Sequence, residues 1–258
     1  MLAELSAVAS RVRRQVGGWL KQRAWRRALA AWRAGHPGED YALFYAWYAR
    51  QRLRSGWHRP QTLGSDHNRD FQRRRAMAMR ALLVELGLRP EHALLDYGCG
   101  SLWVGEALIE YLLPDRYVGL DVIDDFWREA LGRLDPALVA AKRPRLGLVG
   151  SDLDSAVWPP DFILATAVLM HVPPEGLADF FARLLALAAG RTRVLVGHDL
   201  DRGDGLRGTV WQHGRARVER ELAALGWQLA PIGHEAPIPG GRFRLVLFEI
   251  VAGASLPA

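Results

Sequence analysis

The most distinctive local feature of the sequence is the run Leu94-Leu95-Asp96-Tyr97-Gly98-Cys99-Gly100. Its apolar start predicts a buried strand, and the residues from Leu102 onward predict a helix. Gly98 and Gly100 let the backbone between these elements approach a ligand closely. The N-terminus of the following helix favours a carboxylate or a phosphate group. The segment therefore predicts a ligand-binding turn between a strand and a helix.

The spacing of these glycines argues against a dinucleotide site. That fingerprint requires a third glycine at position 103, where this chain has Trp103, and Gly105 is out of register. The carboxylate of Asp96, just before the turn, would repel a pyrophosphate but suits a ligand that carries an ammonium or a sulfonium group. S-adenosylmethionine carries both groups.

Two more acids follow the next two predicted strands. Val118-Gly119-Leu120-Asp121 places a carboxylate at a strand end, where its two oxygens can accept from both hydroxyls of a ribose. Ser151-Asp152-Leu153 places another acid where it can accept from an adenine amino group. Each acid alone has a structural alternative as a helix cap, a loop residue or an Asx turn. Three acids at three successive strand ends are the stronger signal.

With these motifs, the chain resembles the class I S-adenosylmethionine-dependent methyltransferases over roughly residues 90 to 252. The matching segments are LLDYGCG, VGLD, SDLD and FILATAVLMHVPPEGL. The segment from Gly98 is also similar to a bacterial subgroup with a GCGSLRGG loop, although this chain has Trp103 and Val104 where that subgroup has Arg and Gly. The resemblance implies methyl transfer from S-adenosylmethionine and a seven-stranded sheet with a reversed final strand.

The resemblance also implies which residues bind the cofactor. Gly98 and Gly100 would line its methionine portion, Asp121 would bind its ribose, Asp152 with Leu153 would frame its adenine, and Ala165 would touch it. Cys99 is expected as a small residue of the turn, without a nucleophilic role. The expected cofactor-binding set is Asp96, Gly98, Cys99, Gly100, Asp121, Val122, Asp152, Leu153 and Ala165.

Two histidines are candidates for a general base. His171 and His198 each follow a predicted strand, at the edge where open parallel sheets bind ligands. Methyl transfer is an in-line displacement, so the enzyme mainly aligns the reactants. A base assists when the acceptor is an unactivated hydroxyl. Both histidines have the alternative role of a structural loop residue. The segment 201–214 is a candidate acceptor wall, with the alternative of a plain solvated loop.

From residue 93 onward, the sequence predicts strands and helices in alternation, and these elements must position the residues named above. Short apolar runs alternate with helix-length amphipathic segments, which predicts an α/β fold with a doubly wound, mostly parallel sheet. Two final β-rich runs predict an antiparallel pair at one edge of the sheet. The predicted strands are 93–97, 116–121, 145–149, 161–168, 192–198, 227–234 and 242–251, and the predicted helices are 102–113, 123–134, 174–189 and 215–225.

Residues 1–90 are expected to form a basic helical extension that serves as a lid on the catalytic domain, residues 91–258. Helices are predicted over 2–34, over 41–53 and from Ser65 or Asp66 to Gly87. An aromatic stripe that includes Tyr41 and Tyr45 has two interpretations, packing and pocket lining. The helix over 2–34 also has two: peripheral contact with an anionic membrane, or packing within the chain or in a homodimer.

Composition and charge bound the class of protein. The chain has 258 residues, a single cysteine and 50% hydrophobic residues, which indicates a globular protein without a disulfide framework. No apolar run could span a membrane and Arg11 interrupts any signal peptide, so a cytoplasmic protein is expected. Residues 1–90 contain 18 Lys and Arg against 6 Asp and Glu, a net charge of +12, while the remainder carries −6.

The sequence does not decide the chemical class of the methyl acceptor. A small molecule, a glycan or a lipid-linked intermediate, methylated at oxygen, is the first expectation. The alternatives are an RNA or protein acceptor bound by the basic half, and a non-catalytic cofactor-binding partner protein. Residues 165–168 lack the Asn/Asp-Pro-Pro-aromatic signature of many enzymes that methylate base or amide nitrogens. No cluster has metal-ligand spacing, so no metal is expected.

Overall fold

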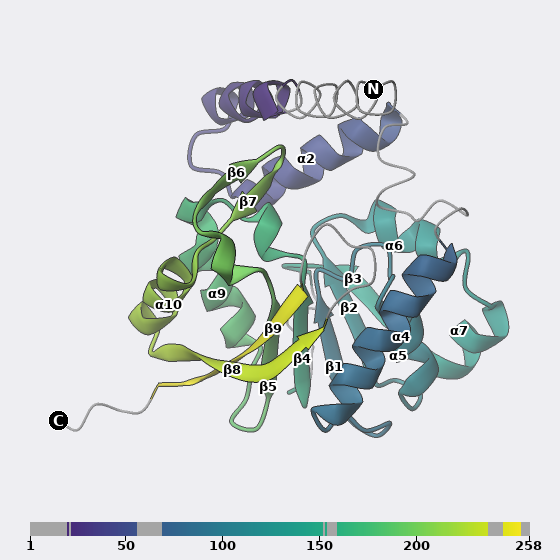
Figure 1. The fold of residues 1–258 in the computed structure, drawn as a ribbon. Helices are drawn as coiled ribbons and strands as arrows, with labels where there is room; N and C mark the ends of the chain where they lie inside the picture. Colours follow the sequence, from purple (N-terminus) through teal and green to yellow (C-terminus); the bar gives the residue numbers. More distant parts are fainter. Residues whose placement is uncertain are drawn as a thin grey trace, which may run out of the picture.

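A seven-stranded mixed sheet forms the centre of the molecule (Figure 1). The structure is a computed structural model, and it describes residues 20, 22–55, 69–151, 153, 159–236 and 245–253. The strand order is β3-β2-β1-β4-β5-β9-β8, and β9 runs antiparallel to both of its neighbours. The strands are β1 (Leu94–Tyr97), β2 (Tyr117–Asp121), β3 (Arg145–Leu148), β4 (Phe162–Thr166), β5 (Arg193–Gly197), β8 (Trp227–Ala236) and β9 (Leu245–Ala252). The predicted α/β fold with a reversed final strand is confirmed.

Helices cover both faces of this sheet because the strands are apolar on both sides. Within β1, Leu94 packs into the core cluster of one face and Leu95 into that of the other, as alternation along a strand requires. One face carries α4 (Arg69–Glu85), α5 (Gly105–Tyr111), α6 (Asp124–Leu131) and α7 (Pro136–Lys142), and the other carries α9 (Leu177–Ala186) and α10 (Arg215–Ala224). Short 3-10 helices are η2 (Leu169–His171), η3 (Pro174–Gly176) and η4 (Leu200–Arg202).

The topology creates a crevice at the carboxyl ends of the central strands. The chain leaves β1 toward β2 on one side, and β4 returns on the other side of β1. Loops on the two sides of this switch point diverge, which is where ligands bind in open α/β sheets. The loops after β1, β2 and β4 therefore meet at one place.

The helix of residues 22–35 and α2 lie across the top of the sheet (Figure 1). Residues 22–35 are helical and pack on α2 (Tyr41–Arg54) through Trp25, Trp32 and Phe44. Trp25 also meets Trp211 edge to face, with ring centroids 5.7 Å apart. Trp211 belongs to a hairpin of β6 (Gly205–Arg207) and β7 (Val210–Gln212). This end of the extension thus packs on the main body of the fold.

Some details differ from the prediction for local reasons. The helix expected over 123–134 is α6, which ends at Leu131, and α7 is a further helix that was not predicted. Pro136 begins α7 and Asp135 caps it by accepting from the Ala137 N–H. The expected loop over 201–214 contains the β6–β7 hairpin. The first 19 residues of the chain and the expected cap at Ser65 or Asp66 lie outside the described residues. None of the helices searched among the described residues has the length and apolarity needed to cross a membrane.

Candidate functional site

The turn after β1 brings the glycines to the switch point. Gly98 and Gly100 have φ angles of +82° and +51°, in the left-handed region that favours glycine. The Gly98 N–H donates to the Leu120 carbonyl at 2.7 Å, which ties the turn to β2. A methyl group at Gly98 would overlap the side chain of Val168, which follows β4. The turn therefore packs closely between two strand ends.

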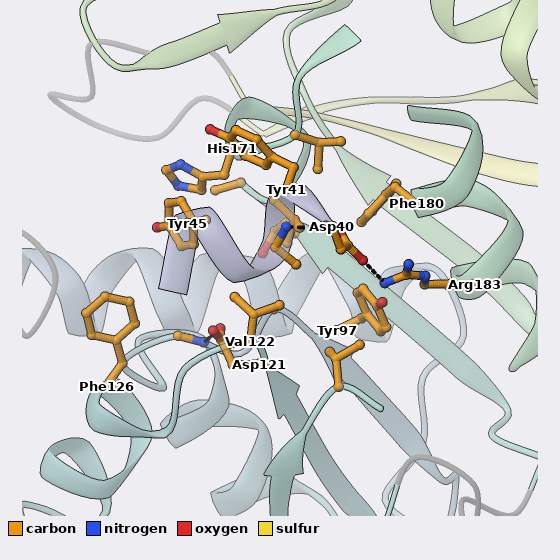
Figure 2. A pocket seen from close by; sticks show the side chains of 18 of the residues that line it. Asp40, Tyr41, Tyr45, Tyr97, Asp121, Val122, Phe126, His171, Phe180 and Arg183 are labelled. Carbon is orange, nitrogen blue, oxygen red and sulfur yellow. Dashed lines mark hydrogen bonds and ion pairs between the residues drawn. The ribbon is translucent and has the colours of Figure 1, made fainter. Parts of the chain in front are cut away.

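A cavity of about 270 Å³ opens at this point (Figure 2). Its walls combine the turn after β1, the ends of β2 and β4, the α2 helix above and α9 at the side. Among the described residues, aromatic and aliphatic side chains share its apolar lining. The aromatic rings other than histidine that line it are Tyr41, Tyr45, Tyr97, Trp103, Phe126 and Phe180.

Asp121 is the central polar group of the cavity wall. It is 7% exposed, its Oδ2 accepts from the Gly100 N–H at 2.8 Å, and its Oδ1 accepts from the Ile123 N–H at 3.2 Å. Burial raises the pKa of this carboxyl to about 6, while the backbone donors counteract the rise. The next residue, Val122, also lines the cavity. Asp121 and Val122 are therefore placed where the sequence predicted a ligand.

Asp96 and Cys99 lie beside the cavity, and neither is part of its lining. Asp96 is 3% exposed and accepts from the Tyr117 hydroxyl at 2.8 Å. Burial raises its pKa to about 7. Cys99 is buried against Gly119, and burial raises the pKa of its thiol well above the ordinary value. Asp96 is thus bonded to a residue of β2 and is not part of the cavity lining, whereas the sequence predicted a direct contact with a cationic ligand.

The side expected to hold adenine is described only in part. Asp152 lies outside the described residues. Leu153 packs against Gly147 of β3, and Val149 lines the cavity. Ala165 is fully buried in the core, and the next residues, 166–168, line the cavity in its place. The residues that line the cavity at the end of β4 therefore follow the expected one, Ala165, by one to three positions.

The two candidate histidines have different surroundings. His171, in η2, lines the cavity and meets the Tyr45 ring with centroids 4.7 Å apart. His198 is 6% exposed, lies outside the lining and packs beside His213 with centroids 5.6 Å apart. Burial, together with His213, lowers the pKa of His198 to about 4. The structure thus places one of the two histidines where an acceptor could reach it.

The expected acceptor wall over 201–214 does not line the cavity. Trp211 packs against Trp25, and His213 is buried under η2. The β6–β7 hairpin therefore packs, through Trp211, on the helix of residues 22–35.

Sequence reasoning missed the contribution of α9. Asp179, Phe180 and Arg183 line the cavity, and Arg183 forms an ion pair with Asp40, the N-cap of α2 (Figure 2). Their spacing of one and three residues on an ordinary amphipathic helix carries no signal of a ligand. The helix α2 forms the roof of the cavity. The aromatic stripe that includes Tyr41 and Tyr45 was the sequence feature that indicated this role, although such a stripe more often packs in a core.

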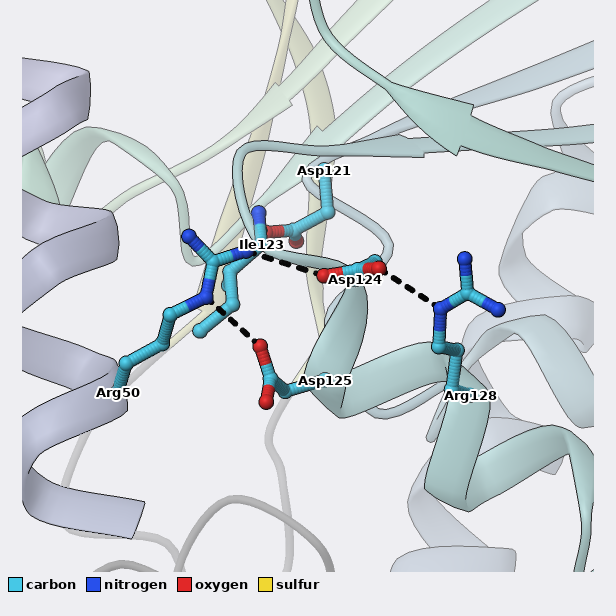
Figure 3. Close-up of polar contacts among 6 residues, drawn as sticks. All are labelled: Arg50, Asp121, Ile123, Asp124, Asp125 and Arg128. Carbon is cyan, nitrogen blue, oxygen red and sulfur yellow. Dashed lines mark hydrogen bonds and ion pairs between the residues drawn. The ribbon is translucent and has the colours of Figure 1, made fainter. Parts of the chain in front are cut away.

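A second set of ion pairs ties α2 to the loop that follows β2. Arg50 donates to Asp124 at 3.0 Å and to Asp125 at 2.9 Å, both in the first turn of α6 (Figure 3). On its other side, Asp124 accepts from Arg128 at 2.7 Å. Because α6 starts three residues after Asp121, these contacts hold the roof and the acid of the cavity in one unit.

The described residues hold no group of three or more His, Cys, Asp or Glu that could bind a metal ion. No family model matches the sequence. A search of curated proteins found no match either.

Solved structures share the fold over most of the chain. A magnesium protoporphyrin IX methyltransferase from Synechocystis PCC 6803 with bound SAM has a TM-score of 0.62 at 19% identity, covering 84% of this chain and all of its own. The 1,6-didemethyltoxoflavin-N1-methyltransferase of Burkholderia thailandensis has a TM-score of 0.57 at 19% identity, covering 81% of this chain and 89% of its own.

A SAM-dependent methyltransferase from Leishmania major has a TM-score of 0.56 at 16% identity, covering 87% of this chain and 91% of its own. All three similarities cover more than four fifths of this chain at low sequence identity. The chain has the fold of the class I S-adenosylmethionine-dependent methyltransferases.

Proposed function

We propose that this protein is an S-adenosylmethionine-dependent methyltransferase that acts on a small molecule. The observation that carries the proposal is the position of Asp121, whose carboxylate joins the glycine turn at Gly100 and faces an aromatic cavity. Each carboxylate oxygen accepts one backbone N–H and keeps a further lone pair for a ribose hydroxyl. A pyrophosphate beside this acid would be repelled.

The residues of the turn fit such a cofactor. Gly98 and Gly100 expose backbone on the cavity surface, and Val122 and Val149 supply apolar contacts for a flat ring. When bound, S-adenosylmethionine supplies an electrophilic methyl group on a positively charged sulfur. The aromatic side chains around the cavity exclude water and offer ring faces that attract a cation.

His171 is the proposed general base for a hydroxyl acceptor. Its ring lines the cavity beside Tyr45, and a neutral imidazole can accept the proton that the acceptor oxygen loses as its new bond to carbon forms. Burial raises the pKa of the Tyr45 phenol, with the Asp121 carboxylate as a second cause, so Tyr45 stays protonated and can donate a hydrogen bond. Positioning by these two groups is the main contribution of the chain to an in-line displacement.

The roof favours a small acceptor over a polymer. Tyr41, Ala42 and Tyr45 of α2 cover the cavity from above, and Asp40 closes one end through Arg183. A hydroxylated small molecule, a sugar or the head of a lipid-linked intermediate would fit beneath α2. An RNA or a folded protein would need this helix to move away.

Calorimetric titration with S-adenosylmethionine and S-adenosylhomocysteine tests the cofactor. We expect both to bind, NAD not to bind, and Asp121→Ala to weaken binding by about 10- to 100-fold, because two hydrogen bonds to a charged group are lost. Asp201→Ala is the control, because Asp201 is an exposed acid outside the cavity. Folded wild-type protein that binds neither compound would refute the proposal.

Transfer of a labelled methyl group tests the acceptor class. We expect hydroxylated small molecules to be labelled and bulk RNA or protein to remain unlabelled. His171→Gln should lower kcat by about 10²- to 10⁴-fold on a hydroxyl acceptor without weakening S-adenosylhomocysteine binding. Labelling of RNA with a steep dependence on salt would support the basic half as the binding surface in its place.

A further inference from the structure

A buried histidine that the proposed chemistry does not use lies directly beneath the loop that carries His171. His213 follows β7 and is 0% exposed. Its Nε2 lies 2.9 Å from the Val172 carbonyl oxygen and 3.1 Å from the Leu169 carbonyl oxygen. Carbonyl oxygens only accept hydrogen bonds, so Nε2 must carry the hydrogen. The geometry therefore assigns the ring tautomer of His213.

The two acceptors of this hydrogen bond bracket His171. Leu169 begins η2, His171 ends it, and Val172 comes next. Inside the loop, the His171 N–H donates to the Val168 carbonyl at 2.8 Å and the Val172 N–H to the Leu169 carbonyl at 3.1 Å. Single 3-10 turns have poorer hydrogen-bond geometry than α-helices. The His213 ring supplies a third link, from another part of the chain, that joins both ends of this loop.

His198 holds His213 from the opposite side. The Nε2 of His198 accepts from the backbone N–H of His213 at 3.3 Å, and the His198 N–H donates to the Val246 carbonyl of β9 at 3.1 Å. The end of β5 is thereby linked through His213 to η2. Asp204 and Arg217 are the charged groups that act on His213, and burial is the main cause that lowers its pKa. The pair is thus uncharged at neutral pH.

The second nitrogen of the His213 ring, Nδ1, gives a reason to assign the ring a role as an Nε2–H donor. His213 Nδ1 is buried and has no hydrogen-bond partner among the described residues. A buried polar atom without a partner costs about 1–3 kcal/mol, and a nonpolar residue would avoid that cost. An imidazole at this position is therefore better explained by what its Nε2 holds than by packing alone.

We propose that His213 is a positioning residue, which keeps His171 in the cavity by holding η2 through a shared Nε2–H donor, with His198 as its support. The proposal rests on the proposed function in one respect, because it treats His171 as the residue that meets the acceptor. His198, expected from the sequence as a second base, acts in this arrangement through the backbone of His213.

The test uses the full chain with labelled histidine and NMR spectroscopy. The ring signals of His171 are identified by their loss in His171→Gln. In the wild type we expect His213 to be neutral with the proton on Nε2, and a nuclear Overhauser contact between the His171 and Tyr45 rings. His213→Leu should abolish that contact and shift the His171 signals. His213→Gln should restore both, because its amide N–H reaches about as far as Nε2.

Controls separate positioning from stability. His92→Leu makes the same chemical change at a half-buried histidine beyond the other end of β1 and should leave the His171 signals unchanged. Signals are compared well below each variant's unfolding midpoint. If His213→Leu lowers the midpoint but keeps the His171–Tyr45 contact, or if the His213 proton sits on Nδ1, the proposal is wrong.

The same variants distinguish this proposal from the proposed function. His213→Leu should bind S-adenosylhomocysteine as the wild type does, because the glycine turn and Asp121 are untouched. Once an acceptor is found, kcat should fall in His213→Leu and recover in His213→Gln, with the KM for S-adenosylmethionine unchanged. A wild type that binds no cofactor would refute the proposed function, while the coupling of His213 to His171 would still be read from the NMR signals.

Discussion

At the scale of single residues, Asp121 combines two opposing requirements. A ribose-binding acid must be ionised to offer both of its oxygens as acceptors, yet burial raises its pKa to about 6. The N–H groups of Gly100 and Ile123 limit that rise. The charge state of Asp121 therefore changes within a pH range where the protein can be studied.

This carboxyl predicts that cofactor binding depends on pH. The raised pKa means that the protonated form dominates below about pH 6, so affinity for S-adenosylhomocysteine should fall as the pH is lowered, by up to about tenfold per unit. Above that pH, affinity should level off. Dissociation constants measured between about pH 5 and pH 8 check this. Asp121→Asn should bind weakly at every pH, and a wild-type affinity that stays constant would contradict the assignment.

The backbone geometry at Gly98 should make this position intolerant of a side chain. Gly98→Ala forces a side chain into a positive φ of +82° and against Val168, so it should lower the free energy of unfolding by about 2 kcal/mol or more and weaken cofactor binding. Denaturant unfolding and calorimetry measure the two effects. Gly190→Ala is the matched control, because nothing lies within 4 Å of its Cβ position. Equal stability of the two variants would exclude a strained turn.

At the scale of elements, α2 is the roof of the cavity and is held near both ends. Asp40 caps the helix and pairs with Arg183 of α9, and Arg50 near its C-terminus pairs with the first turn of α6. Between them, Phe44 packs into the cluster of Trp25 and Trp32, whereas Ala46 and Ala49 pack into the cluster that contains Ile123 and Phe126. Apolar burial supplies most of the attachment, since partly exposed ion pairs contribute little.

The ion pairs of Arg50 should slow the local opening of α2. Arg50→Gln should speed hydrogen exchange of the α2 amides by up to about fivefold, since pairs of this exposure contribute no more than about 1 kcal/mol. Added salt should act in the same direction. Arg128→Gln is the control, because Arg128 also binds Asp124 but from α6 itself. Equal exchange in the two variants would show that Arg50 does not hold the roof.

At the scale of the whole molecule, the N-terminal helices and the body share a core. Trp25 is 2% exposed and contacts Phe44 of α2 as well as Trp211 of the β6–β7 hairpin. α4 packs into the same core cluster as β1 and α5. Helices that share side-chain contacts of this kind with a sheet are expected to unfold together with it.

Trp25 tests this shared core. Trp25→Ala should lower the free energy of unfolding by about 3–5 kcal/mol while the protein keeps a single transition. Trp47→Ala, which removes the same side chain from a position that is 41% exposed, should cost far less. Denaturant unfolding followed by fluorescence and by circular dichroism measures both. Two separate transitions in the wild type would show that the N-terminal helices form an independent unit.

The succession of strands along the chain and the place of the glycine turn could be predicted from the sequence because both depend on local patterns. Apolar runs identify strands, and Pro or Gly residues end them. The carboxyl ends of parallel strands meet at one edge, so Asp121 and Gly100 could be placed together without a structure. Helix α7 was missed, although its cap Asp135 and its first residue Pro136 were present in the sequence.

The sequence by itself determined the α/β fold, the turn at Gly98 and Gly100, and the acid that meets it, since each depends on residues close together in the chain or on the rule that parallel strands align. Only the tertiary structure decided which histidine faces the cavity. His171 and His198 both follow strands, but His213, from a distant hairpin, buries one and supports the loop of the other. Likewise, Arg183 and Tyr45 reach the same cavity from remote helices. Such contacts form between segments that are distant in the chain, so the local pattern around each residue does not identify its partners.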